Sequence, residues 1–193
     1  RDALSAKDKT MLIGYEGLAS NAYFEVLPIL ILNQKKEFTF SGRNRRPPRD
    51  AVNAMLSFAY TLIANDYIAA LETVGLDPYV GFLHTLRPGR ASLALDMMEE
   101  LRAYLGDRFV LSLINKRQIT SKDFLSQGDN GVVMTDKGKK VFISAWQARK
   151  RDVITHPYLN EKIEIGLLPY AQSMLMARFI RQDIDDYPVF LIK

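Results

Sequence analysis

Apolar residues recur every three or four positions along most of the chain, which is the spacing of amphipathic helices. The pattern predicts helices over 11–26, 51–74, 92–101 and 169–181. The segment 51–74 is apolar on nearly all sides in its middle, so we expect it to be the central buried helix. Pro28 and Gly75 are suited to end the first two helices. The chain is therefore predicted to have a mainly α-helical fold.

Two further segments change this pattern locally. Gln127–Gly131 is rich in turn residues, so residues 124–126 and 132–134 are predicted to pair as a short β hairpin, the only strands expected near 124–134. Asp77 followed by Pro78 is typical of a helix start, and we expect that helix to run to His84. Neither segment alters the expectation of a single helical domain over 1–193.

Candidate chemistry gathers between residues 81 and 102. His84 follows an apolar run, and on the next helix Glu99 and Glu100 lie three and four residues after Asp96. Carboxylates held that close repel each other unless a cation binds between them or one is protonated. Imidazole and carboxylate together suit Mn²⁺, and Mg²⁺ if water completes its shell. The alternative is a solvated helix face beside a hydrogen-bonded core histidine.

Glu16 raises a similar question on the first helix. Its neighbours one turn away are Leu12, Ala19 and Tyr23, which place the carboxylate toward the apolar side. An unpaired buried charge there would cost about 3–5 kcal/mol. An arginine partner, a position at the edge of the apolar stripe or a bound metal would each remove that cost.

Positive charge is concentrated in one loop. The formal net charge is only +4, but Arg43, Arg45, Arg46 and Arg49 lie within SGRNRRPPRD, where the prolines prevent a helix. Guanidinium groups on a stiff loop are well suited to phosphate oxygens, although a charge run is often only a solvated face. We expect the arginines of this loop to bind the backbone of a polyanion.

The composition limits the class of protein. Of the residues 48% are apolar and 25% charged, which is typical of a globular protein, and the longest apolar stretch is too short for a bilayer. The chain has no cysteine, so disulfides, thiolate metal sites and cysteine nucleophiles are excluded. We expect an intracellular protein without membrane association. The abrupt start without methionine suggests a fragment of a longer protein.

Four segments are informative when they are read together: Tyr15-Glu16-Gly17, the loop 42–50 running into 52–58, the segment 75–84 ending at His84, and the segment 92–100. Together they resemble one family, the CRISPR-associated adaptation integrases, or "Cas one" proteins. The resemblance extends over almost the whole chain, and the order and spacing of the His–loop–Asp block are its most specific part.

The resemblance implies a helical catalytic domain in which Glu16, His84 and Asp96 bind a divalent metal, Mn²⁺ or Mg²⁺. Glu99 stands where some members carry a further acidic residue. Family members insert short DNA fragments into the CRISPR repeat array, where a 3′-hydroxyl attacks a phosphodiester, and they also have metal-dependent endonuclease activity. Arginines of the 43–49 loop, with Arg87 and Arg90, are expected to contact the backbone of double-stranded DNA.

The resemblance also implies partners and a location. The family has an N-terminal β-rich domain that forms most of a homodimer and is missing here, and its usual partner is a second small CRISPR adaptation protein. A prokaryotic cytoplasmic location follows. The alternatives are a non-catalytic helical DNA-binding domain, which would use the carboxylates only structurally, and a structural module that packs against the missing domain.

Overall fold

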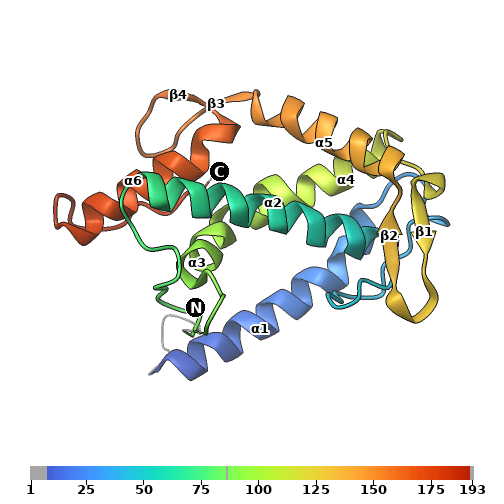
Figure 1. Ribbon diagram of the computed structural model, residues 1–193, viewed down its shortest axis with the longest axis horizontal. Helices are drawn as coiled ribbons and strands as arrows, with labels where there is room; N and C mark the ends of the chain where they lie inside the picture. The colour runs from blue at the N-terminus through green and yellow to red at the C-terminus, as the bar shows by residue number, and fades with distance from the viewer. Residues whose placement is uncertain (1–7, 86, 192–193) are drawn as a thin grey trace. The chain divides into compact units, whose positions relative to one another are not determined.

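The computed structural model describes residues 8–85 and 87–191, and it is mainly α-helical, as predicted (Figure 1). Its α-helices are α1 (Lys9–Val26), α2 (Ala51–Thr73), α3 (Ser92–Leu101), α4 (Arg108–Asn115), α5 (Asp136–Lys150) and α6 (Leu168–Ile180). A π-helix, η3 (Arg102–Asp107), connects α3 to α4. Short 3-10 turns are η2 (Leu27–Leu30), η4 (Ser121–Asp123), η5 (Gly128–Asn130) and η6 (Ile165–Leu167).

The strands form two antiparallel pairs. The pair β1 (Phe124–Ser126) and β2 (Val132–Met134) has the predicted position, with Leu125 opposite Val133. The pair β3 (Val153–Thr155) and β4 (Lys162–Glu164) was not predicted. Each strand of this second pair has only three residues, which is too short for an alternating pattern to be recognisable.

The chain forms two compact units. Unit 1 contains residues 1–57 and 110–139, and unit 2 contains residues 58–109 and 140–193. Helices α2, α4 and α5 contribute residues to both. That the whole chain acts as one catalytic domain remains a prediction.

Unit 1 is organised by long-range hydrogen bonds as well as by apolar packing. The Asn115 carboxamide accepts the backbone N–H groups of Leu32 and Asn33, at 2.8 and 3.2 Å. Gln34 donates to the carbonyls of Ile114 and Ile119, at 2.9 and 3.0 Å. The Asn115 bonds satisfy backbone N–H groups of the segment after η2, which has no helix or strand to do so, and the Gln34 bonds satisfy two carbonyls at and after the end of α4.

The β1–β2 pair of unit 1 holds the proline-containing loop. The Val132 N–H donates to the carbonyl of Pro48 at 2.8 Å. Gly131 has φ +87°, and a Cβ there would overlap the side chain of Pro47 at 2.7 Å. The peptide bond between Arg46 and Pro47 is cis. The hairpin thus fixes the backbone that carries the arginines.

Unit 2 has an aromatic core. Phe142 packs edge-on against Phe58 and Phe109, each at 5.1 Å between ring centroids, and stacks on Trp146 at 6.4 Å. Such geometries add to the free energy of burying the rings. Lys150 extends the contact between α5 and α2 with an ion pair to Asp66 at 2.8 Å.

Helix α2 is the longest helix and begins and ends within one residue of the predicted bounds. Its length and a mean hydropathy of 1.3 over 18 residues would suffice to cross a membrane. Within the described fold, however, Val52, Met55, Ala59, Ile63 and Leu71 are buried. Packing within the protein therefore accounts for its apolar character.

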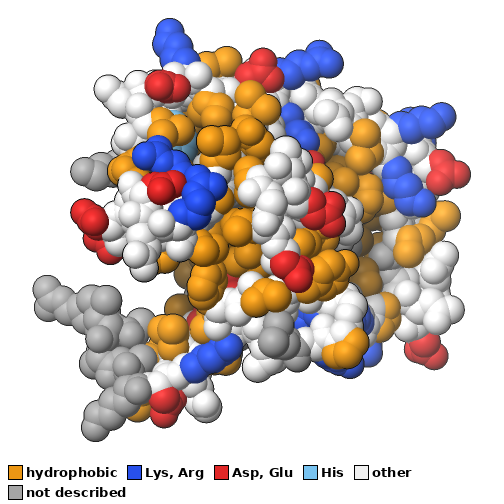
Figure 2. Space-filling view, turned by 60° about the vertical axis from the view of Figure 1, so that its left-hand side comes forward, with side chains coloured by type: hydrophobic (Ala, Val, Ile, Leu, Met, Phe, Trp, Pro, Cys, Tyr) orange, Lys and Arg blue, Asp and Glu red, His pale blue; other side chains and the backbone are white. Residues whose placement is uncertain are grey.

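Hydrophobic side chains also reach the surface, where they gather beside Lys and Arg side chains (Figure 2). In unit 2, Tyr79, Val80 and Phe82 are exposed, and all three belong to the segment that leads to His84. Much of the apolar run before His84 is therefore exposed, although apolar runs of this kind are usually buried.

Candidate active site

Residues 77–85 and 87–91 form no helix, so the predicted helix from Asp77 to His84 is wrong. The Asp77 carboxylate accepts the backbone N–H of Tyr79 at 2.8 Å, which stabilises a turn. The Pro78 carbonyl accepts the N–H groups of Leu93 and Ala94, at 2.9 and 3.3 Å. These N–H groups belong to the first turn of α3, where no intrahelical acceptor exists. The loop is thereby attached to the start of α3.

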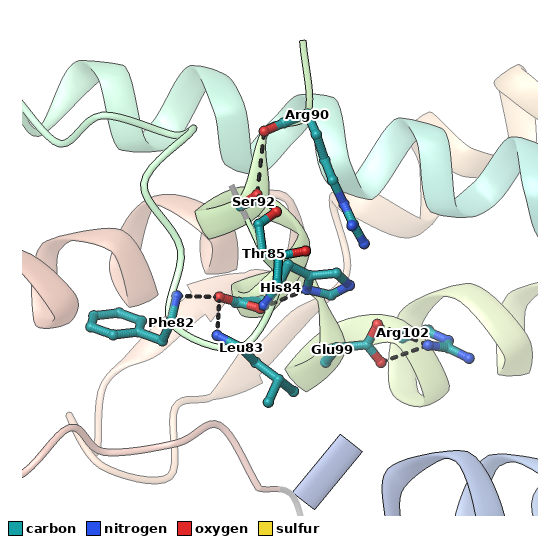
Figure 3. A network of polar contacts seen from close by, with 9 residues as sticks. Phe82, Leu83, His84, Thr85, Arg90, Ser92, Glu99 and Arg102 are labelled. Carbon is teal, nitrogen blue, oxygen red and sulfur yellow. Dashed lines mark hydrogen bonds and ion pairs between the residues drawn. The ribbon is translucent and has the colours of Figure 1, made fainter. Parts of the chain in front are cut away.

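Asp96, on α3, is hydrogen-bonded to three residues of this loop, Phe82, Leu83 and His84, which are labelled in Figure 3. Its Oδ2 accepts the backbone N–H groups of Phe82 and Leu83, at 2.6 and 2.9 Å. Its Oδ1 accepts the His84 N–H at 2.9 Å and contacts His84 Nδ1 at 2.6 Å. A carboxylate has about four acceptor sites, and here four donors occupy them. Asp96 therefore orients both the loop and the imidazole.

These bonds set the charge state of Asp96. Burial raises the pKa of its carboxyl group, but the hydrogen bonds from the His84 ring and from the three backbone N–H groups lower it more. The pKa lies below its ordinary value as a result. Asp96 is accordingly an anion at neutral pH and accepts a hydrogen bond from His84 Nδ1–H.

Gly81 allows the close approach of loop and helix. A Cβ on Gly81 would lie 2.7 Å from Asp96 Oδ2 and 2.7 Å from the Ser92 carbonyl carbon. Ser92 itself donates to the carbonyls of Thr85 and Arg90, at 3.2 and 3.4 Å. The absence of a side chain at position 81 is thus a geometric requirement.

One of the two ring nitrogens of His84, Nδ1, is already hydrogen-bonded. With Nδ1 donating to Asp96, the neutral ring keeps its lone pair on Nε2. The side chain is 24% exposed and that of Asp96 is 10% exposed. A carboxylate that binds one imidazole nitrogen and so directs the other is the usual support of a metal-binding or proton-transferring histidine.

Glu99 lies one turn after Asp96 and is held by a second set of contacts. Arg102 donates to both its carboxylate oxygens, at 2.8 and 2.7 Å. The guanidinium lies 5.1 Å from the ring centroid of Tyr60, whose hydroxyl donates to Asp107 at 2.5 Å. Burial and the Asp107 charge raise the pKa of Tyr60, so it remains a donor. The sequence left the role of Glu99 undecided, and the structure shows that it forms an ion pair with Arg102.

Glu100, adjacent in sequence, has different partners. Its carboxylate accepts the Phe190 N–H at 2.7 Å, the Gln172 amide at 2.5 Å and the Tyr187 hydroxyl. Gln172 in turn faces His156 Nε2 at 3.0 Å. Burial raises the pKa of Glu100, and these hydrogen bonds only partly offset that effect. Sequence reasoning missed this network, because its members are up to 90 residues apart.

Glu16 lies on α1 in unit 1 and is exposed, so the predicted position on a buried apolar side is wrong. The reason is that most of the apolar residues of α1 are exposed too, and Phe24 is its buried residue. His84 and Asp96 come together in unit 2. In residues 8–85 and 87–191, no group of three or more His, Asp or Glu side chains is arranged to hold a metal ion.

Arg43 has a structural task. Its guanidinium donates to the Asn44 carbonyl at 2.5 Å, to Asn53 Oδ1 at 2.8 Å and to Ser57 Oγ at 3.0 Å. The fully buried Asn53 also donates to the Gly42 carbonyl at 2.9 Å. Sequence reasoning missed this role of Asn53. The one signal in the sequence was the presence of an amide side chain within an otherwise apolar helical segment.

The remaining predicted DNA-contacting arginines are differently placed. Arg45, Arg46, Arg49 and Arg87 are exposed, and Arg90 is half-buried. Within the described residues none of these five forms an ion pair with a carboxylate. They are therefore suited to an external anion.

Arg45 shares a cavity of about 560 Å³ in unit 1 with polar residues of α1. The α1 side of this cavity includes Ser20, Asn21 and Glu25. Ser20 is four residues after Glu16, so the two project from the same side of the helix. The arginine loop and the polar side of α1 thus face one hollow within the same unit.

The comparison with known proteins decides the family. The family model described as "CRISPR associated protein Cas1" matches residues 1–148. This chain belongs to the Cas1 family. A CRISPR-associated endonuclease Cas1 from Chlorobaculum tepidum is 53% identical over 186 residues, 96% of this chain and 54% of the relative. The resemblance inferred from the sequence is confirmed.

Solved structures agree with the Cas1 fold. A Cas1 protein from Thermotoga maritima superposes with a TM-score of 0.81 at 28% identity, covering 91% of this chain and 53% of that one. A casposase bound to integration product has a TM-score of 0.86 at 23% identity, covering 97% and 56%, and supports the fold alone. The chain spans about half the length of the relatives that it matches.

Proposed function

We propose that this chain is the helical catalytic part of a metal-dependent DNA integrase and endonuclease of CRISPR spacer acquisition. The observation that carries the proposal is the His84–Asp96 pair at 2.6 Å, held by a loop whose three N–H groups are fixed by the same carboxylate. Membership of the Cas1 family supplies the reaction class. The whole protein would insert short DNA fragments into the repeat array.

The donors of the chain fit Mn²⁺ or Mg²⁺ in their chemistry. His84 would offer Nε2, and Glu16 and Asp96 would offer carboxylate oxygens, which are ligands that Mn²⁺ accepts. Asp96 would also orient His84 through Nδ1, and Glu99 would be an additional acidic residue beside them. When bound, the ion would polarise the phosphoryl group and stabilise the leaving oxygen.

The reaction conserves phosphodiester bonds. The 3′-hydroxyl of the incoming fragment forms a new phosphorus–oxygen bond, its proton is released, and the bond to the leaving 3′-oxygen breaks. The residues of this chain would hold the strands for this exchange. Exposed Arg45, Arg46 and Arg49, with Arg87 and Arg90, would contact phosphates of double-stranded DNA and carry little sequence information.

We also propose the assembly and location that family membership implies. The full-length protein would act as a homodimer with a second small CRISPR adaptation protein, in the prokaryotic cytoplasm. Purification of the full-length protein with its partner, followed by measurement of the mass of the complex, tests this assembly. A monomer that joins DNA strands without the partner would contradict it.

The catalytic role is tested by His84→Ala and Glu99→Gln in the full-length protein, with Glu161→Gln as a control that removes an exposed carboxylate elsewhere. We expect both site variants to bind DNA and to lose Mn²⁺-dependent strand joining and cleavage, while the control retains them. If both variants bind DNA and join strands at the wild-type rate, the alternative of a non-catalytic helical DNA-binding domain holds.

The DNA contact is tested by Arg45→Ala and Arg46→Ala. Each phosphate contact contributes about −0.9 to the slope of log affinity against log salt concentration for duplex DNA. We expect the double variant to flatten the slope by about 1.8 and to weaken binding equally for unrelated sequences. An unchanged slope would exclude this loop as the contact surface.

A further inference from the structure

A second cationic cavity lies in unit 2 and includes none of His84, Asp96 and Glu99. Its volume is about 720 Å³, within the range of about 300–1,000 Å³ typical of small-molecule sites. Residues from η3, α4, α5, β3 and the C-terminal segment line it: Tyr104, Arg108, Arg149, Ile154, Thr155, Pro157 and Leu191.

Tyr104 organises the charged side of this cavity. The Arg108 guanidinium carbon lies 5.5 Å from the centroid of its ring, and that of Arg149 lies 5.8 Å away. Phe190 packs edge-on against the same ring at 5.6 Å. Cation–π contacts at these distances are attractive. The ring therefore holds two guanidinium groups at one place without neutralising either.

The charge of the cavity is only partly compensated. Arg149 forms an ion pair with Asp152 at 2.8 Å. In the described part of the chain Arg108 has no carboxylate partner. One net positive charge thus remains, and planar guanidinium groups bind phosphate oxygens in pairs.

The rest of the lining forms a mostly apolar wall. It consists of Ile154, Pro157 and Leu191 together with Thr155. A ligand that satisfies both sides must carry a phosphate and a flat, weakly polar body. A nucleotide has this composition, whereas an acidic peptide offers carboxylates without the flat body.

We propose that this cavity binds an unpaired nucleotide of a DNA strand, with its phosphate on Arg108 and Arg149 and its base against the apolar wall. In a duplex the bases are stacked inside, so that only phosphates would be available and the apolar wall would stay empty. Single strands offer both groups. The inference rests on the proposed function in one respect: the bound nucleotide is taken to belong to a DNA strand and not to be a free nucleotide.

The test uses fluorescence anisotropy of the full-length protein with a labelled single-stranded oligonucleotide and with the duplex of the same sequence. Variants are Arg108→Gln and Tyr104→Leu; Arg151→Gln is the matched control, since it removes an exposed charge that does not line the cavity. We expect Arg108→Gln to weaken single-strand binding several-fold and to reduce the salt slope by about 0.7. Duplex binding and the control should change little.

Three outcomes would overturn the proposal. Arg108→Gln that leaves single-strand affinity unchanged excludes the site, and an equal loss for duplex and single strand shows a plain phosphate contact. Deoxynucleoside monophosphate, or a poly-glutamate peptide, that competes as well as the oligonucleotide shows a different ligand. Because binding is measured, inactive His84→Ala protein should give the wild-type affinity, so that failure of the catalytic proposal is recognised separately.

Discussion

Asp96 and Glu100 are carboxylates one turn apart on α3, and they hold two different segments in opposite ways. Asp96 fixes the loop around Phe82–His84 through three backbone N–H groups and an imidazole. Glu100 fixes the C-terminal segment through Tyr187, Phe190 and Gln172. The pKa of Asp96 is lowered and that of Glu100 is raised.

The opposite pKa shifts of Asp96 and Glu100 follow from their different surroundings, and they indicate different roles for the two carboxylates. Four donors converge on Asp96, enough to outweigh the cost of burial and keep its charge beside His84. Glu100 is more deeply buried, with neutral donors, and within the described residues no Lys, Arg or His forms an ion pair with it. Asp96 is thus suited to orient His84 in the candidate site, and Glu100 is suited to stabilise the fold by binding the C-terminal segment.

The largest expected effect is that of Asp96→Asn. The amide turns a donor toward the loop N–H groups or His84, so the imidazole loses its orientation. We expect strand joining or metal affinity to fall about 10–100-fold, with thermal unfolding and Mn²⁺ titration measured on the same sample. Wild-type metal affinity in a folded variant would show that Asp96 does not position His84.

Glu100→Ala should act mainly on stability. It leaves the Phe190 N–H, the Gln172 amide and the Tyr187 hydroxyl without their acceptor, at a cost of about 1–3 kcal/mol. Denaturant unfolding gives this value. Activity per folded molecule should be reduced less than in Asp96→Asn. A larger loss of activity in Glu100→Ala than in Asp96→Asn would contradict the roles assigned to the two carboxylates.

Gly81→Ala tests the loop side of the comparison. The added methyl meets Asp96 and Ser92 at 2.7 Å, so we expect a loss of about 1–3 kcal/mol in the free energy of unfolding. Gly14→Ala on α1 is the matched control, because no atom lies within 4 Å of its Cβ. There the higher helix propensity of alanine should add up to about 1 kcal/mol.

The smallest effect is on the pH dependence of stability. A lowered pKa in Asp96 contributes stability above the pKa of unfolded Asp, and this is lost as pH falls through the folded value. A raised pKa in Glu100 costs stability above its folded value, and protonation relieves the cost as pH falls toward the unfolded value. The melting temperatures of wild type and Glu100→Gln should therefore converge on mild acidification, whereas those of wild type and Asp96→Asn converge only below the ordinary range of Asp.

Periodic elements were predictable from the sequence. Helix α2, the 124–134 hairpin and α6 depend on local apolar spacing and turn residues, and they lie within a residue of the predicted bounds. The His84–Asp96 pair was also predicted, because both belong to one specific block. The predicted helix from Asp77 to His84 was wrong because the carbonyl of Pro78 accepts the N–H groups of Leu93 and Ala94 at the start of α3 instead of bonding within a helix of its own.

Other features had no local signal. The partners of Glu100 and Asn53 are set by tertiary contacts, and no spacing rule identifies them. Burial of Glu16 was inferred from neighbours on its own helix, but the structure leaves those neighbours exposed. Arg43 and Arg45 look alike in sequence, yet only the former donates to Asn53 and Ser57.

The π-helix between α3 and α4 has a consequence for how the family diverges. Each residue of an α-helix rotates the chain by about 100°, and a π-turn accommodates one residue more than an α-turn would. Because the π-turn takes up one additional residue, deleting Ala103 would return the segment to an α-turn and leave Glu99 and Glu100 facing nearly the same way relative to Arg108. A homologue that is one residue shorter in the segment 102–107 is therefore expected to lack the π-turn and still to share this site, so a single alignment gap here would not mark its loss.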